Sequence, residues 1–585
     1  MSDSANIARH LPLMAARQPE VAAVKIPRGR TSDGRIDYLT LSFRELDAEV
    51  DAWVAKLSAR GVQRGDRVLV MVRQGLPLIA AAFALFKLGA VPVIIDPGMG
   101  RKNFLACVAR STPRVLLGIP LAQGMSLLFR TAFKSVALRV WVSGSPTARL
   151  AHASQISNLK FEMVNNTPAD LAAVLFTSGS TGAPKGVCYE HGMFEAQVRL
   201  VRETYDIKPG EIDLPMLPIF ALFNPALGLT TIVPEIDPSR PATVDPEKIV
   251  QAIQQEKVTN SFGSPTLWRI ISRHCAKHGA TLPTMKRVLM AGAPVPPSLF
   301  DNVQKILSNG TAYSPYGATE SLPVASISSH EVLGETASAT AAGKGTCVGR
   351  PVPGVTVKII PISDEPVSEI RELPAGEIGE IIVSGPMVTK EYDQLPEATA
   401  VAKIQTPNAK CQPISKSDSS GVCDLASGIS APPGAVWHRL GDVGYLDASG
   451  RLWFCGRKAE RVITKSGPLY TEQVEPIFNA HPDVARSALI ATGHDNQRAA
   501  IVIEPRSREV VATPSLRRKL VRELRVLGAA HPHTDLIRLA YLHPHFPVDV
   551  RHNAKIHRLA LARWAANHHG YELDKREVSR EALKL

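Results

Sequence analysis

The chain has 585 residues, 45% hydrophobic and 21% charged, which is the composition of a folded globular protein rather than a disordered one. Its formal net charge of +13 suits an anionic small molecule, a membrane surface or nucleic acid as partner. Because the basic residues are scattered and only 5% of residues are aromatic, the composition favours a soluble enzyme over a nucleic-acid-binding protein. The amino-terminal sequence MSDSANIARHLPLMAARQPE has no apolar signal core, and the apolar segment 76–86 is too short to span a bilayer. We therefore expect a cytoplasmic protein without a transmembrane segment.

The first part of the chain predicts a parallel α/β unit. Ser42 and Glu45 have the spacing of a helix capping box, and apolar residues follow at helical spacing until a glycine ends the run. Residues 67–72, 77–88 and 91–96 then have the patterns of strand, helix and strand. This alternation is typical of a parallel sheet covered by helices.

The apolar strand predicted at 171–176 leads into the sequence TSGSTGAPKG. Small residues allow close approach of a ligand, hydroxyls and backbone N–H groups donate to anions, and Lys185 adds a positive charge. A Walker A loop needs Gly-Lys followed by Ser or Thr, and the order here excludes it. An ordinary Ser/Gly turn is the structural alternative, but such a turn seldom ends in Pro-Lys-Gly after an apolar strand. The loop is therefore predicted to bind phosphate.

The remaining chain shows several successive sequence patterns. Residues 257–268 and 286–294 repeat the design of a strand followed by a Gly/Pro loop, which places ligand loops at the carboxyl ends of strands. From about residue 340, short β segments follow, including a hairpin at 444–456. Residues 402–435 lack periodicity and are interpreted as a mobile surface insertion. From about residue 460, mixed strand and helix patterns indicate a small separate unit.

Four motifs occur in a fixed order: the loop 177–186, YSPYGATES (313–321), WHRLGDVGYLDASGRLWFCGR (437–457) and the lysine of FPVDVRHNAKIHR (546–558). In order and spacing they resemble the adenylate-forming superfamily of acyl-CoA synthetases, luciferases and peptide-synthetase adenylation domains. The resemblance covers nearly the whole chain. It implies an α/β fold with a large N-terminal adenylate-forming domain of stacked α/β sheets plus a β-rich subdomain, followed by a small mobile α+β C-terminal lid. The implied boundaries are 1–459, with the β-rich subdomain at about 340–459 and the flexible insertion at about 402–435, and 460–585.

The resemblance also implies roles for individual residues, with ATP and Mg²⁺ as cofactors. The residues implied in binding the triphosphate are Thr177, Ser178, Gly179, Ser180, Thr181, Gly182 and Lys185. In the YGATE segment, Tyr316 would stack on the adenine and Gly317 would belong to the ATP site. Thr319 would contact phosphate and Glu320 would be the metal ligand, and both would be catalytic residues. On its own, this segment could equally be a turn before a helix.

Three further roles follow from the later motifs. Asp442 would accept the ribose hydroxyls and Arg457 would contact the same sugar, although a solvated hairpin pair is the alternative for these two residues. Glu460 falls on the family's hinge position. Lys555 falls on the catalytic lysine that reaches the carboxylate and the α-phosphate from the lid.

Within the superfamily, LPIFALFNPALGLTTIVPEIDPSRPATVDP and FPVDVRHNAK are most similar to the β-lactone synthetases of bacterial long-chain olefin biosynthesis. Ala221 replaces the histidine that many ligases carry, Glu460 replaces the hinge aspartate, and Asn553-Ala554 precede Lys555 in place of Ser/Thr-Gly. These departures cluster where the second half-reaction is arranged. They put transfer to coenzyme A in doubt.

The similarity therefore implies ATP-dependent activation of a 2-alkyl-3-hydroxy fatty acid as acyl-AMP, then attack by the β-hydroxyl to give a β-lactone, AMP and pyrophosphate. A long-chain fatty acyl-CoA synthetase or fatty acyl-AMP ligase is the alternative, and a scaffold that lost activity is a third. The implied partners are the small-molecule fatty β-hydroxy acid and other olefin-pathway enzymes, a lactone decarboxylase and a ketone reductase, without nucleic acid. The residues expected to form the substrate pocket are Phe220, Ala221, Phe223, Phe262, Gly263 and Gly292. Leu222, Pro265 and Trp268 are expected to add apolar surface to this pocket, and the alternative for each is a place in the hydrophobic core.

Overall fold

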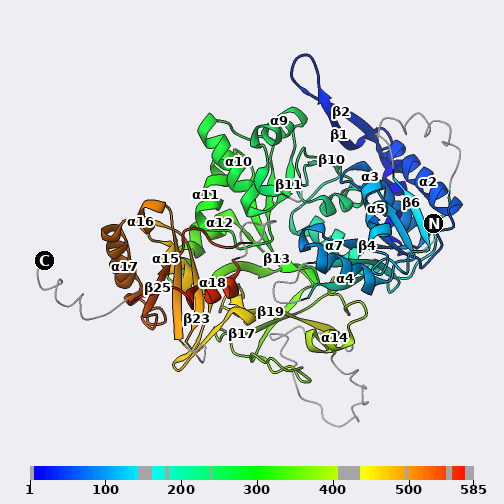
Figure 1. Ribbon diagram of the computed structural model, residues 1–585. Coiled ribbons are helices and arrows are strands. Elements are labelled where there is room, and N and C mark those ends of the chain that lie inside the picture. Colours follow the sequence, from blue (N-terminus) through cyan, green and yellow to red (C-terminus); the bar gives the residue numbers. More distant parts are fainter. Residues whose placement is uncertain are drawn as a thin grey trace, which may run out of the picture.

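The computed structural model of the protein describes residues 5–142, 161–177, 183–237, 240–405, 435–493, 498–548 and 556–572. The predicted phosphate-loop residues 178–182 and Lys555 lie outside these ranges, as do residues 406–434 of the expected insertion. In the ribbon view the segments from blue to yellow form one large body, and the orange and red C-terminal segments lie beside it at the left (Figure 1). None of the helices in the described ranges combines the length and the apolarity of a membrane span.

A six-stranded sheet is built from the first part of the chain, in the order β6-β5-β3-β4-β7-β8. Its neighbouring strands are parallel except for the antiparallel β7–β8 pair. The strands are β3 (Arg67–Met71), β4 (Val91–Ile95), β5 (Val115–Gly118), β6 (Leu138–Trp141), β7 (Leu171–Thr177) and β8 (Lys185–Glu190). The helices of this part are α1 (His10–Arg17), α2 (Phe43–Ala59), α3 (Leu76–Leu88), α4 (Arg101–Ser111), α5 (Pro120–Leu128) and α7 (His191–Thr204). The parallel α/β unit predicted from 67–96 is confirmed.

The capping box at the start of α2 is also confirmed. The backbone N–H of Ser42 donates to Glu45 Oε2 at 2.7 Å, and the backbone N–H of Glu45 donates to Ser42 Oγ at 3.2 Å. These two bonds satisfy donors that the first helical turn would otherwise leave without a partner. The apolar face of α2 can then pack in the core beside α3, where Leu46, Val54 and Leu57 are buried.

The second sheet has fourteen strands and joins the centre of the chain to the β-rich segment. Its order is β16-β17-β19-β20-β15-β14-β13-β12-β11-β9-β10-β1-β2, and β18 pairs with β19. Its parallel central strands are β10 (Thr230–Ile232), β9 (Ile212–Asp213), β11 (Asn260–Gly263), β12 (Arg287–Met290) and β13 (Thr311–Ala318). Strand β1 (Ala22–Arg30) pairs in parallel with β10 and antiparallel with β2 (Ile36–Ser42). The other antiparallel strands are β14 (Ser321–Ser328), β15 (Thr346–Pro351), β16 (Thr356–Ile360), β17 (Gly379–Ser384), β18 (Lys403–Gln405), β19 (Val436–Leu446) and β20 (Leu452–Arg457).

Three helices accompany the parallel strands of this sheet and bury their apolar faces in one core cluster, α9 (Pro246–Glu256), α10 (Pro265–His278) and α11 (Pro297–Ile306). The shorter helices of this part are α8 (Asn224–Leu227), α12 (Ser329–Glu331) and α13 (Ala337–Ala341), with α14 (Pro396–Ala402) farther along the chain. Residues 403–405 belong to β18, so the irregular insertion expected from residue 402 starts later than predicted. The reason is tertiary, because this short segment is ordered by pairing with β19.

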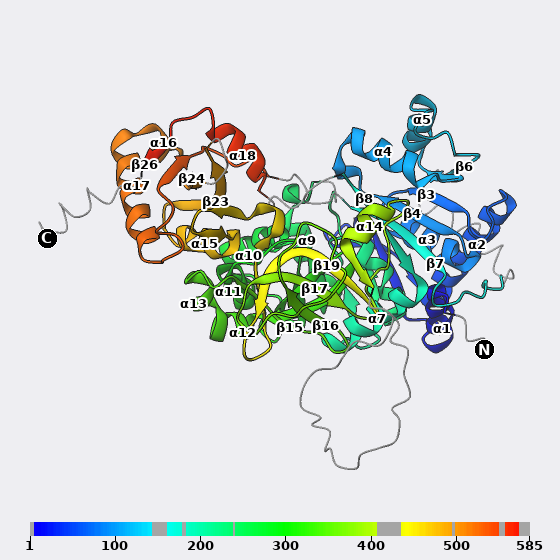
Figure 2. The ribbon, with the colours of Figure 1, turned by 90° about the horizontal axis from the view of Figure 1, so that it is seen from below.

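The C-terminal segment has a core of its own, as the sequence pattern predicted for a small separate unit. Its strands are β21 (Val462–Thr464), β22 (Gly467–Leu469), β23 (Val484–Thr492), β24 (Arg498–Pro505), β25 (Leu539–Leu542) and β26 (Tyr571–Glu572). Its helices are α15 (Thr471–Asn479), α16 (Arg508–Ala512), α17 (Pro514–Ala529) and α18 (Arg558–Ala565). One hydrophobic cluster contains only residues from Val462 to Tyr571, among them the fully buried Val474 and Phe478. In the view from below, this segment lies opposite α4 and α5 (Figure 2).

Candidate active site

A cavity of about 2350 Å³ lies where both large sheets and the C-terminal segment meet. Its wall includes the ends of β4, β7 and β13, the β19–β20 hairpin and the start of α18. The carboxyl ends of parallel strands are where α/β sheets bind ligands, because loops there can present side chains to a common space. Of the predicted site residues, the cavity wall contains Lys185, Phe220, Phe223, Phe262, Gly292, Tyr316, Gly317, Thr319, Glu320, Asp442, Arg457 and Glu460.

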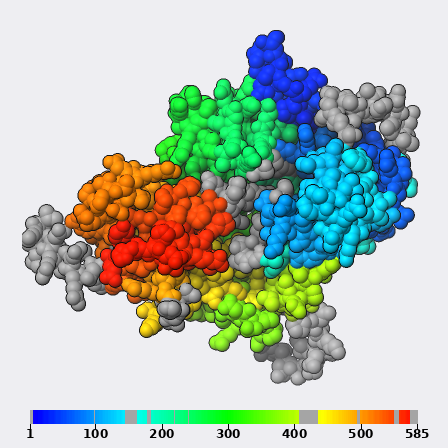
Figure 3. Space-filling model, in the orientation of Figure 1, coloured from blue at the N-terminus to red at the C-terminus, as the bar shows by residue number. Residues whose placement is uncertain are grey.

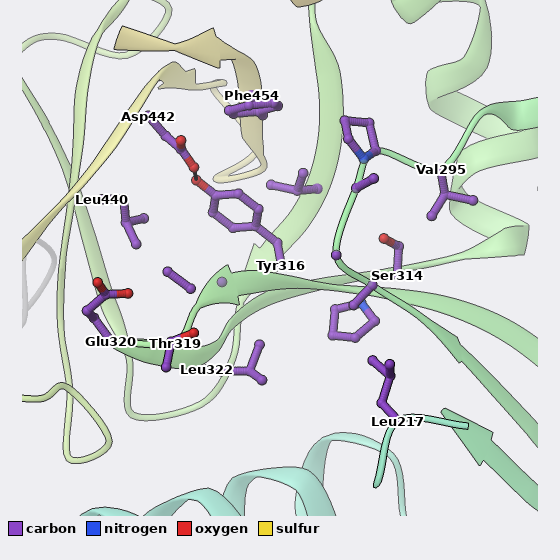
Figure 4. Close-up of a pocket in the computed structure, with 18 of the residues that line it drawn as sticks. Leu217, Val295, Ser314, Tyr316, Thr319, Glu320, Leu322, Leu440, Asp442 and Phe454 are labelled. Carbon is purple, nitrogen blue, oxygen red and sulfur yellow. Dashed lines mark hydrogen bonds between the residues drawn. The ribbon is translucent and has the colours of Figure 1, made fainter. Parts of the chain in front are cut away.

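Tyr316, Asp442 and Arg457 meet at one side of the cavity. The Tyr316 hydroxyl donates to Asp442 Oδ2 at 2.6 Å, although the two residues are 126 positions apart in the chain. In the close-up, the Tyr316 ring extends from β13 towards Asp442, and Phe454 lies beside it (Figure 4). Asp442 and Arg457 are paired across β19 and β20. The hairpin predicted from residues 444–456 therefore brings the carboxylate and the guanidinium together.

Asp442 is almost completely buried, and burial raises the pKa of its carboxyl, while Arg457 and the Tyr316 hydroxyl oppose that shift. Arg457 Nη1 lies 2.7 Å from Asp442 Oδ1, an ion-pair contact. Each carboxylate oxygen has two lone pairs, so the carboxylate can also accept hydrogen bonds from the hydroxyls of a ligand. The pair therefore has the chemistry expected of a sugar-binding site.

Thr319 and Glu320 lie at the turn between β13 and β14 (Figure 4). The Tyr392 hydroxyl donates to Glu320 Oε1 at 2.7 Å, and the Thr389 N–H donates to the Glu320 carbonyl at 2.9 Å. Lys185 Nζ lies 4.7 Å from the centre of the Tyr392 ring. Lys185 is the first residue of β8 and pairs in register with Thr177, the last residue of β7. The lysine after the phosphate-like loop and the glutamate of YGATE are thus brought to the same tyrosine.

Two positions in the cavity wall require glycine for different reasons. A Cβ on Gly317 would lie 2.5 Å from the Ser321 carbonyl oxygen, which is too close. Gly292, two positions after the end of β12, has a φ of +98°, which residues with a Cβ rarely adopt. The two glycines keep the backbone at the cavity wall in place.

Behind Tyr392 lies a buried amine that no sequence motif predicted. Lys403 Nζ donates to Thr389 Oγ1 at 3.1 Å and lies 5.8 Å from the centre of the Tyr392 ring. Burial is the largest cause that lowers the pKa of Lys403 to about 7, with Glu320 opposing the shift and Lys185 adding to it. Burial also lowers the pKa of the neighbouring His438 well below its usual range, so this histidine is neutral.

Lys403→Met is expected to raise the free energy of unfolding near neutral pH, on the order of 2 kcal/mol. Between about pH 7 and its ordinary pKa of 10.5, Lys403 is protonated in the unfolded chain and neutral in the folded one. The stability of the natural protein therefore rises with pH through this window, and the advantage of the variant shrinks. Urea unfolding at several pH values measures both effects. Lys390→Met, at a half-exposed lysine, is the control, and an equal pH slope in both variants would contradict the assignment.

Aromatic rings line the apolar region of the cavity. The Phe220 and Phe262 ring centres are 3.7 Å apart with planes at 23°, and the Phe220 and Phe223 centres are 6.2 Å apart. The side chains of Phe83 and Phe86 from α3 extend this wall, and sequence reasoning did not single them out. Such a wall suits an alkyl chain.

Some predicted pocket residues lie behind the wall. Ala221 and Gly263 are not among the residues that line the cavity, and Ala221 is buried in the surrounding core. Trp268 is completely buried in the core cluster of the large sheet, and Pro265 at the start of α10 is buried too. A helix in this position turns its apolar face towards the sheet, so the core alternative holds for Trp268.

Glu460 lies between the β-rich hairpin and the C-terminal segment, where the hinge was predicted. Its Oε2 is 2.8 Å from Arg558 Nη1, and Arg558 also donates to both carboxylate oxygens of Glu475, at 3.0 and 2.8 Å. Arg558 lies three positions after Lys555. The ion pairs therefore tie the chain that follows Lys555 to the predicted hinge.

A buried ion pair supports the strand that carries Asp442. Arg439 donates to Glu380 Oε1 and Oε2 at 3.1 and 2.7 Å, and both side chains are almost fully buried. The same guanidinium donates to the carbonyls of Glu365 and Val401. Tyr392, Lys403 and this pair were missed in the sequence because no local spacing links them to their partners.

A family model described as "AMP-binding enzyme" matches residues 14–393 of the chain. Two curated proteins, the olefin beta-lactone synthetases of Xanthomonas campestris pv. campestris and Stenotrophomonas maltophilia, are 44% and 43% identical to it. The first alignment covers 97% of this chain and 98% of the relative, and the second 98% and 100%.

Solved structures with the same fold include the amide bond synthetase McbA from Marinactinospora thermotolerans, with a TM-score of 0.72 at 22% identity over 95% of this chain and 99% of that one. ATP-bound MatB from Rhodopseudomonas palustris also has a TM-score of 0.72, at 19% identity over 96% of this chain and 99% of that one. The stacked sheets, the C-terminal unit, the motifs at the cavity and the near full-length similarity agree, and the chain belongs to the family of AMP-binding, adenylate-forming enzymes.

Proposed function

We propose that the protein is an ATP-dependent β-lactone synthetase that acts on 2-alkyl-3-hydroxy fatty acids. The observation that carries the proposal is the identity of 44% over 97% of the chain to an olefin beta-lactone synthetase. The cavity supports it, because a polar side with Tyr316, Asp442 and Glu320 adjoins an aromatic wall around Phe220 and Phe262.

Adenylation joins two anions, so charge neutralisation and alignment supply most of the catalysis. In the proposed reaction, a carboxylate oxygen attacks the α-phosphorus of ATP and pyrophosphate leaves. Lys185, the loop 177–182 and Lys555 are proposed to neutralise the phosphates and the carboxylate, while Asp442 and Arg457 hold the ribose. Mg²⁺ would offset the negative charge of the triphosphate, and the Glu320 carboxylate is a suitable oxygen ligand for it.

In the second step, the β-hydroxyl oxygen of the bound acyl-AMP attacks the carboxyl carbon, AMP leaves, and the hydroxyl proton passes to a base. This closure needs no external acceptor, but it needs a folded substrate shielded from water. The aromatic wall around Phe220 and Phe223 is proposed to hold the alkyl chains. A decarboxylase would act on the released lactone, and a ketone reductase would supply the hydroxy acid.

The product is the sharpest test. A synthetic 2-alkyl-3-hydroxy acid with ATP and Mg²⁺, without coenzyme A, is expected to give AMP, pyrophosphate and a β-lactone in equal amounts. Nuclear magnetic resonance identifies the lactone, and coenzyme A is expected to make no difference. The matched acid without the hydroxyl has no internal nucleophile, and we expect it to stall as acyl-AMP. A thioester formed from this plain acid only with coenzyme A, without lactone from the hydroxy acid, would establish the acyl-CoA synthetase instead.

Asp442→Asn is expected to weaken ATP binding on the order of 2 kcal/mol, about thirtyfold, because the charged acceptor for the ribose hydroxyls is lost. Titration calorimetry measures the affinity, and circular dichroism checks the fold. Asp364→Asn, at an exposed carboxylate, is the control. Equal ATP affinity in the two variants would remove Asp442 from the ribose site.

We further propose that residues 460–585 move as a lid about Glu460 between the two steps. The separate hydrophobic core of this segment supports independent motion. The ion pair of Glu460 with Arg558 connects the proposed hinge residue to α18 of the lid. The enzyme is proposed to work in the cytoplasm.

A further inference from the structure

Helix α5 exposes more apolar side chains than an ordinary surface helix. Its inner face combines Ala122 and Met125 with the fully buried polar side chains of Gln123 and Ser126, and Gln123 Nε2 donates to the Val140 carbonyl at 3.1 Å. Its outer face is apolar, since the exposed fractions are 71% for Leu121 and 76% for Leu128, one heptad apart. Burial normally distributes these residue types the other way round. The helix thus presents leucines to its surroundings without a covering element in the described residues.

More apolar surface adjoins these leucines. Leu127, next to Leu128, is 53% exposed, and Trp141 at the end of β6 is 48% exposed. Trp141 pairs in register with Gly118, two positions before α5 begins, which brings the indole to the amino end of the helix. We call Leu121, Leu127, Leu128 and Trp141 the leucine surface. Contiguous exposed apolar surface of this kind marks an interaction site.

The chain segment that forms the leucine surface has charged side chains of one sign, although one of them, Arg114, pairs with Asp66 from outside the segment. Between residues 97 and 142 the sequence contains no aspartate or glutamate, and its basic residues are Arg101, Lys102, Arg110, Arg114, Arg130, Lys134 and Arg139. Arg101, Lys102, Arg130 and Lys134 are exposed. The Arg101 guanidinium lies 6.0 Å from the centre of the Phe129 ring, which places the start of α4 beside the end of α5. The leucine surface therefore has a basic border.

This part of the molecule also projects and adjoins the active site. The view from below shows α4, α5 and β6 extending from the main body (Figure 2), and the cyan segments form a raised lobe in the space-filling view (Figure 3). Gly98, Met99 and Arg110, from the loop before α4 and from α4 itself, line the cavity. Arg110 also donates to the Pro184 carbonyl, next to Lys185. A ligand held at this lobe would lie near the cavity.

We propose that α5 and its basic border dock the protein on an anionic phospholipid bilayer. Leucines and a tryptophan suit the interfacial layer of a membrane, and the surrounding lysines and arginines suit its anionic headgroups. A protein partner is disfavoured, because lysine is depleted at protein interfaces. Docking there would bring the cavity close to the phase in which long-chain acids dissolve. The inference rests on the lobe and not on which product the enzyme makes.

Co-sedimentation with vesicles tests the docking. The full-length protein is expected to bind phosphatidylcholine vesicles containing phosphatidylglycerol at least about tenfold more tightly than pure phosphatidylcholine vesicles, and added salt should weaken the binding. Leu121→Ser with Leu128→Ser is expected to weaken binding about tenfold or more, because two inserted side chains are lost. Lys102→Glu, Arg130→Glu and Lys134→Glu together should remove the preference for anionic vesicles.

Leu559→Ser is the matched control, since this leucine is 78% exposed in α18, and it is expected to bind like the natural protein. Pyrophosphate exchange with a short soluble acid should be the same in the variants of the lobe, which shows that they are folded. Equal binding to both vesicle types, or no loss in the leucine variant, would overturn the proposal. Sedimentation equilibrium gives a further test. If the natural protein is an oligomer and only the leucine variant is a monomer, the leucine surface is a subunit interface and the proposal is overturned.

Discussion

Arg439→Met is expected to lower the free energy of unfolding by about 3 kcal/mol, because the buried Glu380 carboxylate loses its bidentate partner and keeps only Lys458. Removal of one partner from a buried charge cluster is costly, and three carbonyl bonds of the same guanidinium are lost as well. Urea unfolding followed by circular dichroism measures the change as a lower urea concentration at the midpoint of the transition in which β19 unfolds. The pair is expected to matter for function too, since it supports the strand that carries Asp442.

Two companion variants separate this explanation from a general effect of losing an arginine. Arg28→Met removes an exposed pair with Asp37 and is expected to cost less than about 1 kcal/mol. Arg439→Met combined with Glu380→Met should recover part of the stability, because the buried carboxylate is removed, while Lys458 loses its bond to Glu380 and keeps its bond to the Ser363 carbonyl. A loss in Arg439→Met as small as that in Arg28→Met would contradict the buried-pair argument.

Lys555→Ala is expected to slow adenylation at least about a hundredfold while ATP affinity changes less than about twofold. The reason is that the lysine is proposed to neutralise charge that develops in the transition state, after ATP has bound. Pyrophosphate release gives the rate and calorimetry gives the affinity. Lys519→Ala, at an exposed lysine of the same C-terminal segment, is the control. Unchanged pyrophosphate release would exclude Lys555 as the catalytic lysine.

Arg558 connects the proposed hinge residue to the last helix of the C-terminal segment. Its contacts with Glu460 and Glu475 hold the start of α18, which begins three positions after Lys555 in the sequence. Burial raises the pKa of the Glu475 carboxyl, and the Arg558 guanidinium and the Leu489 N–H oppose the shift. The cluster therefore links the proposed hinge to the helix that follows Lys555 in the sequence.

The sequence by itself determined the features that depend on neighbouring residues. The capping box of α2, the alternation of strand and helix from 67 to 96 and the hairpin that carries Asp442 and Arg457 each follow from short spacings, and the structure confirms them. The ordered motifs also predicted the family, because several short signals at defined distances along the chain are specific together. The start of the expected insertion was wrong, since pairing with β19 orders residues 403–405.

Only the tertiary structure decided which distant residues meet. Tyr392 reaches Glu320 across 72 positions, and Arg439 reaches Glu380 across 59, so no spacing in the sequence could indicate either pair. The pKa of Lys403 depends on burial, which is a property of packing and not of residue type. The same holds for α5, where an apolar run is compatible with a buried helix until the fold turns its leucines outward. Local propensity determines elements, whereas the surroundings of a side chain arise only when those elements pack together.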